Sequence, residues 1–282
     1  MGKFLLILAL QTCLDRAGFS PNAIDGEWGR RSQVALATYC AVKGVPVPSS
    51  PEAAYAEFFR RSPPACATVE VTAADVAALV RMPERPADKA RLRYMGYETL
   101  QEMFAERGHL TETALRRLNP SLPWPNPPVG AKVRIPYFPG QSASVRANVL
   151  RVSLSRREIT AFDAKGRLLL LLPCSIAADK DKLPPAGELL VDTMVPRPNY
   201  TYTPDFTPKG AKVVRHILPP GPNNPVGSVW LGLSLPGYGI HGTPRPERIG
   251  RAESHGCFRL ANWNAKRLYS ICDTGVAVVV ER

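Results

Sequence analysis

Prolines interrupt this chain along its whole length. The 282 residues include 29 prolines, which is roughly twice the usual share of about 5%. Proline breaks helix interiors and is excluded from central strand positions, so long uninterrupted elements are not expected. A chain of this length has room for two or three domains. The sequence therefore predicts several small units that are joined by ordered loops.

The charge balance is basic, and its distribution limits the partners. Lysine and arginine number 36 against 24 acidic residues, which gives a formal net charge of +12. No basic run is interleaved with aromatic residues, so we do not expect a nucleic-acid partner. The remaining interpretations are a solvated basic surface and attraction to an anionic polymer such as a cell envelope. The basic pairs are scattered as Arg30-Arg31, Arg60-Arg61, Arg116-Arg117 and Arg156-Arg157.

A short apolar stretch near the start of the chain has two interpretations. Residues 4–10 are apolar, but polar Gln11, Asp15 and Arg16 follow where a signal peptide has its small-residue cleavage site. The leucine spacing continues as an amphipathic helix, so we expect this stretch to belong to a domain core. If the protein is exported, its signal is absent from this chain. No stretch approaches the roughly 20 apolar residues of an integral membrane segment.

The six cysteines do not form a metal-binding pattern. No CxxC is present, and the four histidines are dispersed, so we expect no metal site. Cys13 and Cys40 lie on two successive helical patterns of one small unit. Either a disulfide joins them or both are buried free thiols.

Residues 1–45 show a helix–turn–helix pattern. A helix is expected from Phe4 to Ala17, where Gly18 stops it, and a second from Arg31 to Val42. Between them lies a tight turn at residues 25–29. Leu10-Gln11, then Asp25-Gly26-Glu27-Trp28-Gly29 and the Ala35-Leu36 helix, resemble the small helical peptidoglycan-binding domain. An unrelated helical hairpin is the alternative.

Residues 46–68 are expected to form a proline-rich linker, with one short helix at residues 53–61. Residues 69–140 follow as a second unit. Tyr97-x-Thr99-Leu100, then Leu115-x-x-Leu118-Asn119-Pro120, then Val129-Gly130-x-x-Val133-x-Ile135-Pro136 is similar to the LysM module, a βααβ glycan-binding fold. The chain departs from that family in a weak first strand and in extra residues between Asn119 and Val129.

From residue 145 the pattern becomes that of short strands. Alternating or apolar runs at 149–154, 158–162, 168–172, 189–193, 229–233 and 276–280 are separated by glycine and proline. This pattern predicts a mostly-β sandwich or barrel over residues 145–282, with one helix at 265–272. The expected fold class is multidomain α+β: a small helical domain, a βααβ module and a mostly-β domain.

A cysteine and two histidines within residues 145–282 indicate a catalytic site. Cys257, in the run Ser254-His255-Gly256-Cys257, lies sixteen residues after His241, in glycine-rich surroundings. A cysteine nucleophile needs a lowered thiol pKa, a base and donors for an oxyanion, and a neighbouring imidazole supplies the base and a counter-ion. Glycine before the cysteine frees backbone N–H groups for an oxyanion hole. We expect Cys257 to be the nucleophile and His241 the base.

The same residues carry a family resemblance. Ile240-His241-Gly242-Thr243, Ser254-His255-Gly256-Cys257-Phe258-Arg259-Leu260 and Asn262 resemble the catalytic signature of the L,D-transpeptidases. Residues 219–227, Trp230 and the loop at 184–187 also match, although the family usually has threonine before its Pro-x-Gly. The resemblance implies that Cys257 is acylated and that His241 acts as base and then acid, oriented by a backbone carbonyl. It implies that the oxyanion or substrate is held by His255, Gly256, Arg259, Ser254, Gly242 and Tyr238. The alternatives are a structural salt bridge for Arg259 and core packing for Tyr238.

The resemblance also implies a reaction and a place. Cys257 would attack the third residue of a tetrapeptide stem, expel terminal D-alanine, and pass the acyl group to a neighbouring stem as a 3→3 cross-link, without metal or cofactor. Water as acceptor would give an L,D-carboxypeptidase, and a lipoprotein amine an anchoring enzyme. Peptidoglycan stem peptides and glycan would be the partners, in the periplasm or cell wall, and a carbapenem would label Cys257. The alternatives of another class are a wall-binding protein with a vestigial site and a papain-like peptidase, whose cysteine precedes its histidine.

Overall fold

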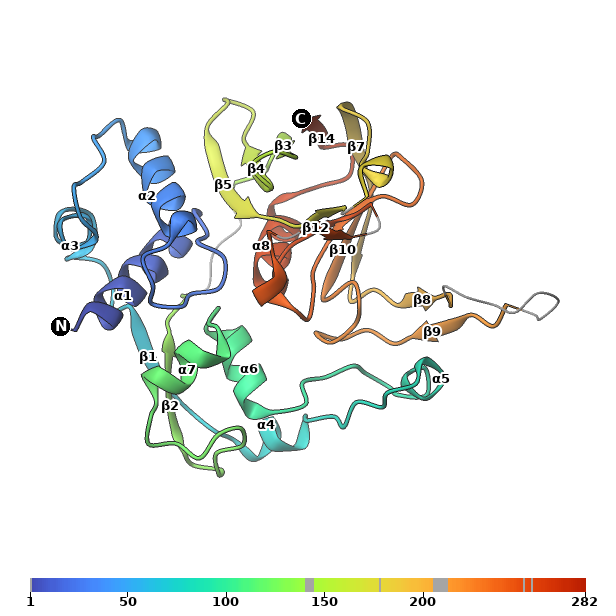
Figure 1. Cartoon of the computed structure of the whole chain (residues 1–282), viewed down its shortest axis with the longest axis horizontal. Coiled ribbons are helices and arrows are strands. Elements are labelled where there is room, and N and C mark those ends of the chain that lie inside the picture. Colours follow the sequence, from blue (N-terminus) through green and yellow to red (C-terminus); the bar gives the residue numbers. More distant parts are fainter. Residues whose placement is uncertain (1, 140–144, 178, 205–212, 251, 255) are drawn as a thin grey trace.

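The computed structural model describes residues 2–139, 145–177, 179–204, 213–250, 252–254 and 256–282, without the side chains of 180 and 252–254. Two helices, a small α/β unit and a larger β-sheet unit follow one another along the chain (Figure 1). The mixed α+β class, with a helical N-terminal part and a curled sheet after it, is confirmed. No described helix has the length and apolar character needed to cross a bilayer.

The first unit is built on helix α1 (Lys3–Arg16) and helix α2 (Arg30–Lys43). Every residue of α1 from Ile7 to Asp15 is buried, so this helix is a core element, as expected, but it is covered on all sides. Its Gln11 holds the turn that follows. The Gln11 amide donates to Asp25 Oδ1 (2.8 Å) and its carbonyl oxygen accepts from the Gly26 N–H (2.9 Å). These two hydrogen bonds explain why Leu10-Gln11 and Asp25-Gly26 occur together in the motif: Gln11 holds the turn in place.

The range expected to be a linker, residues 46–68, is largely structured. Helix α3 (Pro51–Ala54) continues into the π-helical turn η1 (Tyr55–Phe59), and Ala54 and Phe59 are buried against α1 and α2. Strand β1 (Cys66–Glu70) also begins inside this range. The six cysteines are all free, so Cys13 and Cys40 are two buried thiols and not a disulfide.

The second unit places its helices between two antiparallel strands. β1 pairs with β2 (Lys132–Pro136), and between them run α4 (Ala73–Ala77), α5 (Pro86–Lys89), α6 (Leu100–Arg107) and α7 (Glu112–Leu118). Thr99 caps α6 and Thr111 caps α7 through their hydroxyl oxygens. Asn119 ends α7 and its side chain exchanges two hydrogen bonds with the Arg134 backbone, which ties the helix end to β2.

The third unit is an eight-stranded sheet in the order β13-β11-β10-β7-β14-β3-β4-β5. The six runs predicted from the sequence are all strands of this sheet, and the single long helix is α8 (Asn262–Ile271). Strand β7 pairs with β14 through its first half and with β10 through its second half, which lets the sheet curl around a shared core. The bounds are β3 (Val149–Ser153), β4 (Glu158–Phe162), β5 (Leu168–Pro173), β7 (Gly187–Pro196), β10 (Val229–Leu233), β11 (Gly239–His241), β13 (Phe258–Arg259) and β14 (Ala277–Glu281).

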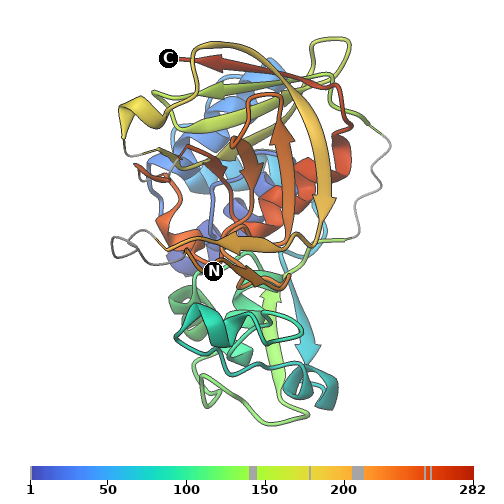
Figure 2. The ribbon, with the colours of Figure 1, turned by 90° about the vertical axis from the view of Figure 1, so that its right-hand side faces the viewer.

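Two short pairs and two single-turn helices complete this unit. β6 (Ile176–Ala177) pairs with β12 (Ala252–Ser254), and β8 (Tyr200–Tyr202) with β9 (His216–Leu218). The turns are η2 (Lys180–Lys182) and η3 (Pro246–Arg248). In Figure 2 the second unit lies below the sheet, and the N-terminal helices lie behind it.

The three units are joined by a buried polar network. Asp15 in α1 is 1% exposed and lies 2.8 Å from Nδ1 of His109, which follows α6. Arg267 in α8 reaches the same Asp15 carboxylate (3.5 Å) and donates to the Arg16 carbonyl. The His109 ring also stacks on Trp263 of α8, with centroids 5.1 Å apart. Because an unpaired buried charge is costly, this network fixes the units relative to one another.

Candidate active site

Two short parallel strands bring His241 and Cys257 to one place. His241 ends β11, and Cys257 directly precedes β13, so the pairing of these strands sets both residues. Ile240 and Phe258, which lie opposite each other in this pair, are fully buried and anchor it in the sheet core. His241 and Cys257 line one cavity of about 600 Å³, with Arg259 and Trp230 also in its wall.

His241 is held in a single orientation. Its side chain is 3% exposed, its Nδ1 donates to the Gly242 carbonyl at 2.6 Å, and its ring stacks on Trp230 with centroids 5.5 Å apart. Burial lowers the pKa of His241 to about 4, and the positive charge of Arg259 acts in the same direction. The imidazole is therefore neutral at pH 7. With the proton on Nδ1, the lone pair of Nε2 remains to accept a proton.

Asn262 packs against Gly242, the residue whose carbonyl orients His241. Asn262 is fully buried, and its Oδ1 accepts from the Ser228 N–H at 3.1 Å. A Cβ on Gly242 would lie 2.2 Å from that same Oδ1, so only glycine fits here. The Asn262 amide also donates to Glu106 Oε2 at 2.9 Å, which reaches over from α6 of the second unit. A side chain 156 positions earlier in the chain thus supports the site.

Cys257 is half-buried and its thiol is protonated at neutral pH. Burial raises the pKa of Cys257, while the Gly239 N–H and the charge of Arg259 oppose that rise in pKa. The Sγ also lies 3.6 Å from the Gly237 carbonyl, to which it donates. The sequence led us to expect a lowered thiol pKa; the expectation was wrong for the free protein, because desolvation outweighs the favourable partners. The free site thus holds a neutral thiol and a neutral imidazole.

The other site residues expected from the sequence fall into three groups. Gly256 has φ of +136°, and a Cβ there would lie 3.1 Å from the Tyr238 ring, so the turn before the cysteine requires glycine. Tyr238 packs against the sheet core and this turn, and it is not in the wall of the Cys257 cavity. Ser254 pairs through its backbone with Ala177, but its side chain and all of His255 lie outside the described residues.

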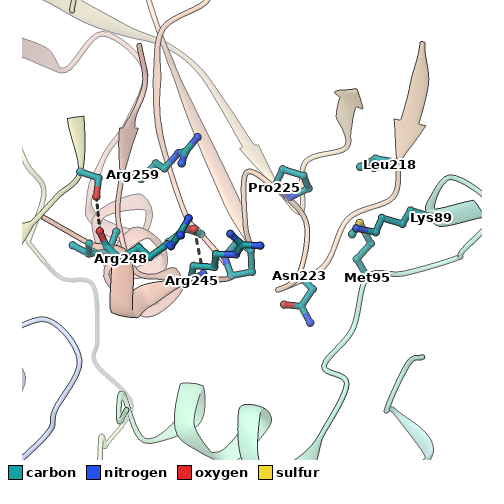
Figure 3. A pocket seen from close by; sticks show the side chains of 12 residues that line it. Lys89, Met95, Leu218, Asn223, Pro225, Arg245, Arg248 and Arg259 are labelled. Atoms are coloured by element: carbon teal, nitrogen blue, oxygen red, sulfur yellow. Dashed lines mark hydrogen bonds between the residues drawn. The ribbon is translucent and has the colours of Figure 1, made fainter. Parts of the chain in front are cut away.

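Arg259 lines both the Cys257 cavity and a second one. The second cavity has a volume of about 290 Å³ and is lined by Arg259 and Pro225, which it shares with the first, and by further basic residues (Figure 3). Sequence reasoning singled out Arg259 but not Lys89, which is distant in the chain, nor Arg245 and Arg248, which lie in the spacer between His241 and Cys257. Among the described residues, no group of three or more His, Cys, Asp or Glu side chains is placed to bind a metal ion.

Comparison with known proteins identifies the third unit. The family profile described as YkuD, L,D-transpeptidase catalytic domain, matches residues 147–280. The protein named L,D-transpeptidase YkuD in Bacillus licheniformis is 30% identical over 183 residues, which are 65% of this chain and 93% of that protein. The chain belongs to the L,D-transpeptidase family.

Two further similarities are partial. YkuD of Bacillus subtilis is 46% identical to this chain over 61 residues, which are 22% of this chain and 37% of that protein. Among solved structures, L,D-transpeptidase 3 from Mycobacterium tuberculosis is 18% identical with a TM-score of 0.39, over 59% of this chain and 84% of that one. In this L,D-transpeptidase, His241 and Cys257 both fall inside the matched catalytic domain.

Proposed function

We propose that this L,D-transpeptidase forms 3→3 cross-links in peptidoglycan through a thioester on Cys257. The observation that carries the proposal is the shared cavity of Cys257 and His241, in which the imidazole is neutral and oriented through Nδ1. A thiol and an imidazole so arranged suit acyl transfer, which needs a nucleophile and a proton acceptor and no cofactor.

The first step acylates the cysteine. Sγ of Cys257 attacks the carbonyl carbon of the third, diamino-acid residue of a tetrapeptide stem, and the thiol proton passes to Nε2 of His241. Because the thiol pKa is raised and the imidazole pKa lowered, proton transfer accompanies formation of the S–C bond and does not precede it. The C–N bond then breaks, His241 returns the proton to the leaving amine, and D-alanine departs.

The second step releases the enzyme. The side-chain amine of a neighbouring stem attacks the thioester carbonyl while His241 accepts its proton. The C–S bond breaks, Cys257 recovers its proton, and the new amide is the cross-link. Backbone N–H groups around Gly256 and Cys257 are our candidates for stabilising the oxyanion in both steps. The charge of Arg259, which already acts on both Cys257 and His241, would orient an anionic substrate.

Other acceptors would change the product but not the acyl-enzyme. Water would give an L,D-carboxypeptidase, and a lipoprotein amine an anchoring enzyme. A wall-binding protein with a vestigial site is the alternative of another class. An exported protein in the periplasm or cell wall fits this substrate, with the helical unit as a peptidoglycan-binding-like domain and the second unit as a LysM-like module that brings the catalytic domain to glycan.

The acceptor can be determined by product analysis. The full chain is incubated with purified disaccharide-tetrapeptides, and the products are analysed by mass spectrometry, with Cys257→Ala as the control. Cross-linked dimers that need Cys257 would support the proposal. Tripeptides alone would identify a carboxypeptidase. Unchanged substrate, with binding to intact sacculi, would favour the vestigial wall-binding protein and contradict the proposal.

A further inference from the structure

A small basic cavity lies where the second unit meets the catalytic domain. Its volume is about 290 Å³. Lys89 at the end of α5 and Met95 reach it from the second unit, while Arg245, Arg248 and Arg259 reach it from the opposite side, as Figure 3 shows. We call Lys89, Arg245, Arg248 and Arg259 the anion pocket. It uses residues from both units, so neither unit forms it alone.

Every charged side chain among the described residues that line this cavity is basic. No aspartate or glutamate is among the described residues that line it. The side chains of Lys89 and Arg245 form no ion pair with any residue in the part of the chain that the structure describes. Like charges in a confined and partly desolvated space repel one another, and a bound anion removes that cost. The cavity therefore favours an anionic ligand group.

The wall that carries Lys89 is docked by backbone contacts. The Met95 N–H donates to the Pro220 carbonyl at 2.8 Å, and the Met95 carbonyl accepts from the Asn223 N–H at 3.0 Å. The Asn223 amide donates to the Gly96 carbonyl at 2.9 Å. Gly221 lies so close that a Cβ there would be 2.1 Å from the Met95 oxygen. These contacts hold the segment after α5 on the loop that ends at Pro225.

The position of the anion pocket connects it with the nucleophile. Arg259 and Pro225 line both this cavity and the cavity of Cys257. A ligand whose reacting carbonyl lies at Cys257 would therefore reach Lys89 by extending along Arg259 and Pro225. The volume is at the low end for pockets that enclose a whole small ligand, so it suits a side chain or end group of a longer one. Met95, Leu218 and Pro225 offer apolar contact to the carbon chain of such a group.

We propose that the anion pocket binds a carboxylate of the peptide stem, so that Lys89 of the second unit is part of the substrate site. The inference rests on the proposed function for the identity of the ligand. It assigns the second unit a direct contact with the peptide, beyond any contact of that unit with glycan. Lys89 and Arg245 act by binding the substrate and not in the bond-making steps.

The test measures binding without turnover. In a Cys257→Ala background, isothermal titration calorimetry compares a synthetic tetrapeptide stem with free carboxylates and the same peptide with its carboxylates amidated. Lys89→Gln and Arg245→Gln are each expected to weaken binding of the acidic peptide roughly five- to tenfold, because each removes one charged contact. Lys165→Gln, an exposed lysine on the turn before β5, is the matched control and should leave the affinity unchanged.

The two peptides give the decisive comparison. The amidated peptide is expected to bind the Cys257→Ala protein more weakly than the acidic peptide does. Adding Lys89→Gln to that protein should leave the affinity for the amidated peptide unchanged. Added salt should weaken binding of the acidic peptide alone. Equal affinities of both peptides, no loss in Lys89→Gln, or no binding of the acidic peptide would overturn the inference.

Failure of the proposed function has a separate signature. Acyl-enzyme formation on the unsubstituted protein is measured with the same acidic peptide by intact mass. A peptide that binds in a Lys89-dependent way but leaves Cys257 unmodified would support the anion pocket and contradict the proposed chemistry. A peptide that acylates Cys257 equally fast in the Lys89→Gln and unsubstituted proteins at subsaturating concentration would contradict the anion pocket alone.

Discussion

Nδ1 of His241 donates a 2.6 Å hydrogen bond to the carbonyl of Gly242, the next residue in the chain. A local backbone oxygen therefore does what a carboxylate does in other cysteine or serine sites: it fixes the tautomer and the ring orientation. Since a carbonyl carries no charge, it does not stabilise the imidazolium as a carboxylate would. Burial is therefore the largest influence on the pKa of His241, which falls to about 4.

Gly242→Ala should sharply lower the rate of Cys257 acylation, although it adds a single carbon atom beside His241. The new Cβ would lie 2.2 Å from Oδ1 of Asn262, whose side chain is held by hydrogen bonds to Ser228 and Glu106. The shift would reach the carbonyl that orients His241, and a misplacement on the order of 1 Å costs roughly 100-fold in rate. Acylation of Cys257 is measured by stopped-flow with a carbapenem. Gly29→Ala, where a Cβ meets nothing within 4 Å, is the control, and wild-type rates in Gly242→Ala would rule out the orienting role.

The acid limb of the pH profile should lie well below that of an ordinary histidine. His241 must be neutral to accept the thiol proton, and its pKa is about 4 and not the usual value near 6.5. We expect the acylation rate to be nearly constant from pH 7 down to pH 5 and to fall only below that. The measurement is the rate of Cys257 acylation against pH at fixed ionic strength. An inflection near pH 6.5 would show that the imidazole is not buried as described.

Arg259→Gln should shift the thiol titration upward. The positive charge of Arg259 lowers the pKa of Cys257 and also that of His241, so its removal raises both. The pH dependence of Cys257 alkylation by iodoacetamide reports the thiol directly. We expect the alkylation profile of Arg259→Gln to move to higher pH. The pH below which its acylation rate falls should also be higher, because the pKa of His241 rises. A thiol pKa that falls or stays the same would show that Arg259 acts on the substrate alone.

Asp15→Ala should destabilise the whole chain. Its carboxylate is 1% exposed and faces both His109 and Arg267, so its removal leaves a largely buried guanidinium without its counter-ion. Such losses cost about 3 kcal/mol. Urea unfolding measures the change in the free energy of unfolding. Glu27→Gln breaks an exposed ion pair with Arg117 and should have no measurable effect. Equal stability of both variants would mean that the network does not join the units.

The sequence predicts the strands of the catalytic sheet, and it singles out the histidine and the cysteine that line one cavity at its β13 edge. Alternation in Val149–Ser153 and apolar runs such as Leu168–Pro173 indicate strands locally, because one or both faces of each strand are buried. The spacing of His241 and Cys257 is also local, since His241 ends β11 and Cys257 directly precedes the adjacent strand β13. The order of the His241 and Cys257 motifs along the chain was interpreted through the resemblance to a family.

What the sequence did not reveal depends on contacts between distant segments. Glu106 and Asn262 are 156 positions apart, and nothing near either residue indicates that they meet. Lys89 ends the four-residue helix α5, and contacts of Met95 and Gly96 with the loop at Pro220 and Asn223 hold its segment beside Arg245. The raised thiol pKa has the same origin: the motif shows the favourable partners of Cys257, while desolvation comes from the fold.

The most direct test of the account is the mass of the acyl-enzyme. The protein is mixed with a disaccharide-tetrapeptide ending in D-alanine, quenched in acid, and analysed intact and after proteolysis. We predict an adduct equal to the substrate less D-alanine, located on Cys257 and absent from Cys257→Ala. An adduct on another residue, or an unmodified Cys257 with substrate present and the fold intact, would contradict the assignment of Cys257 as the nucleophile.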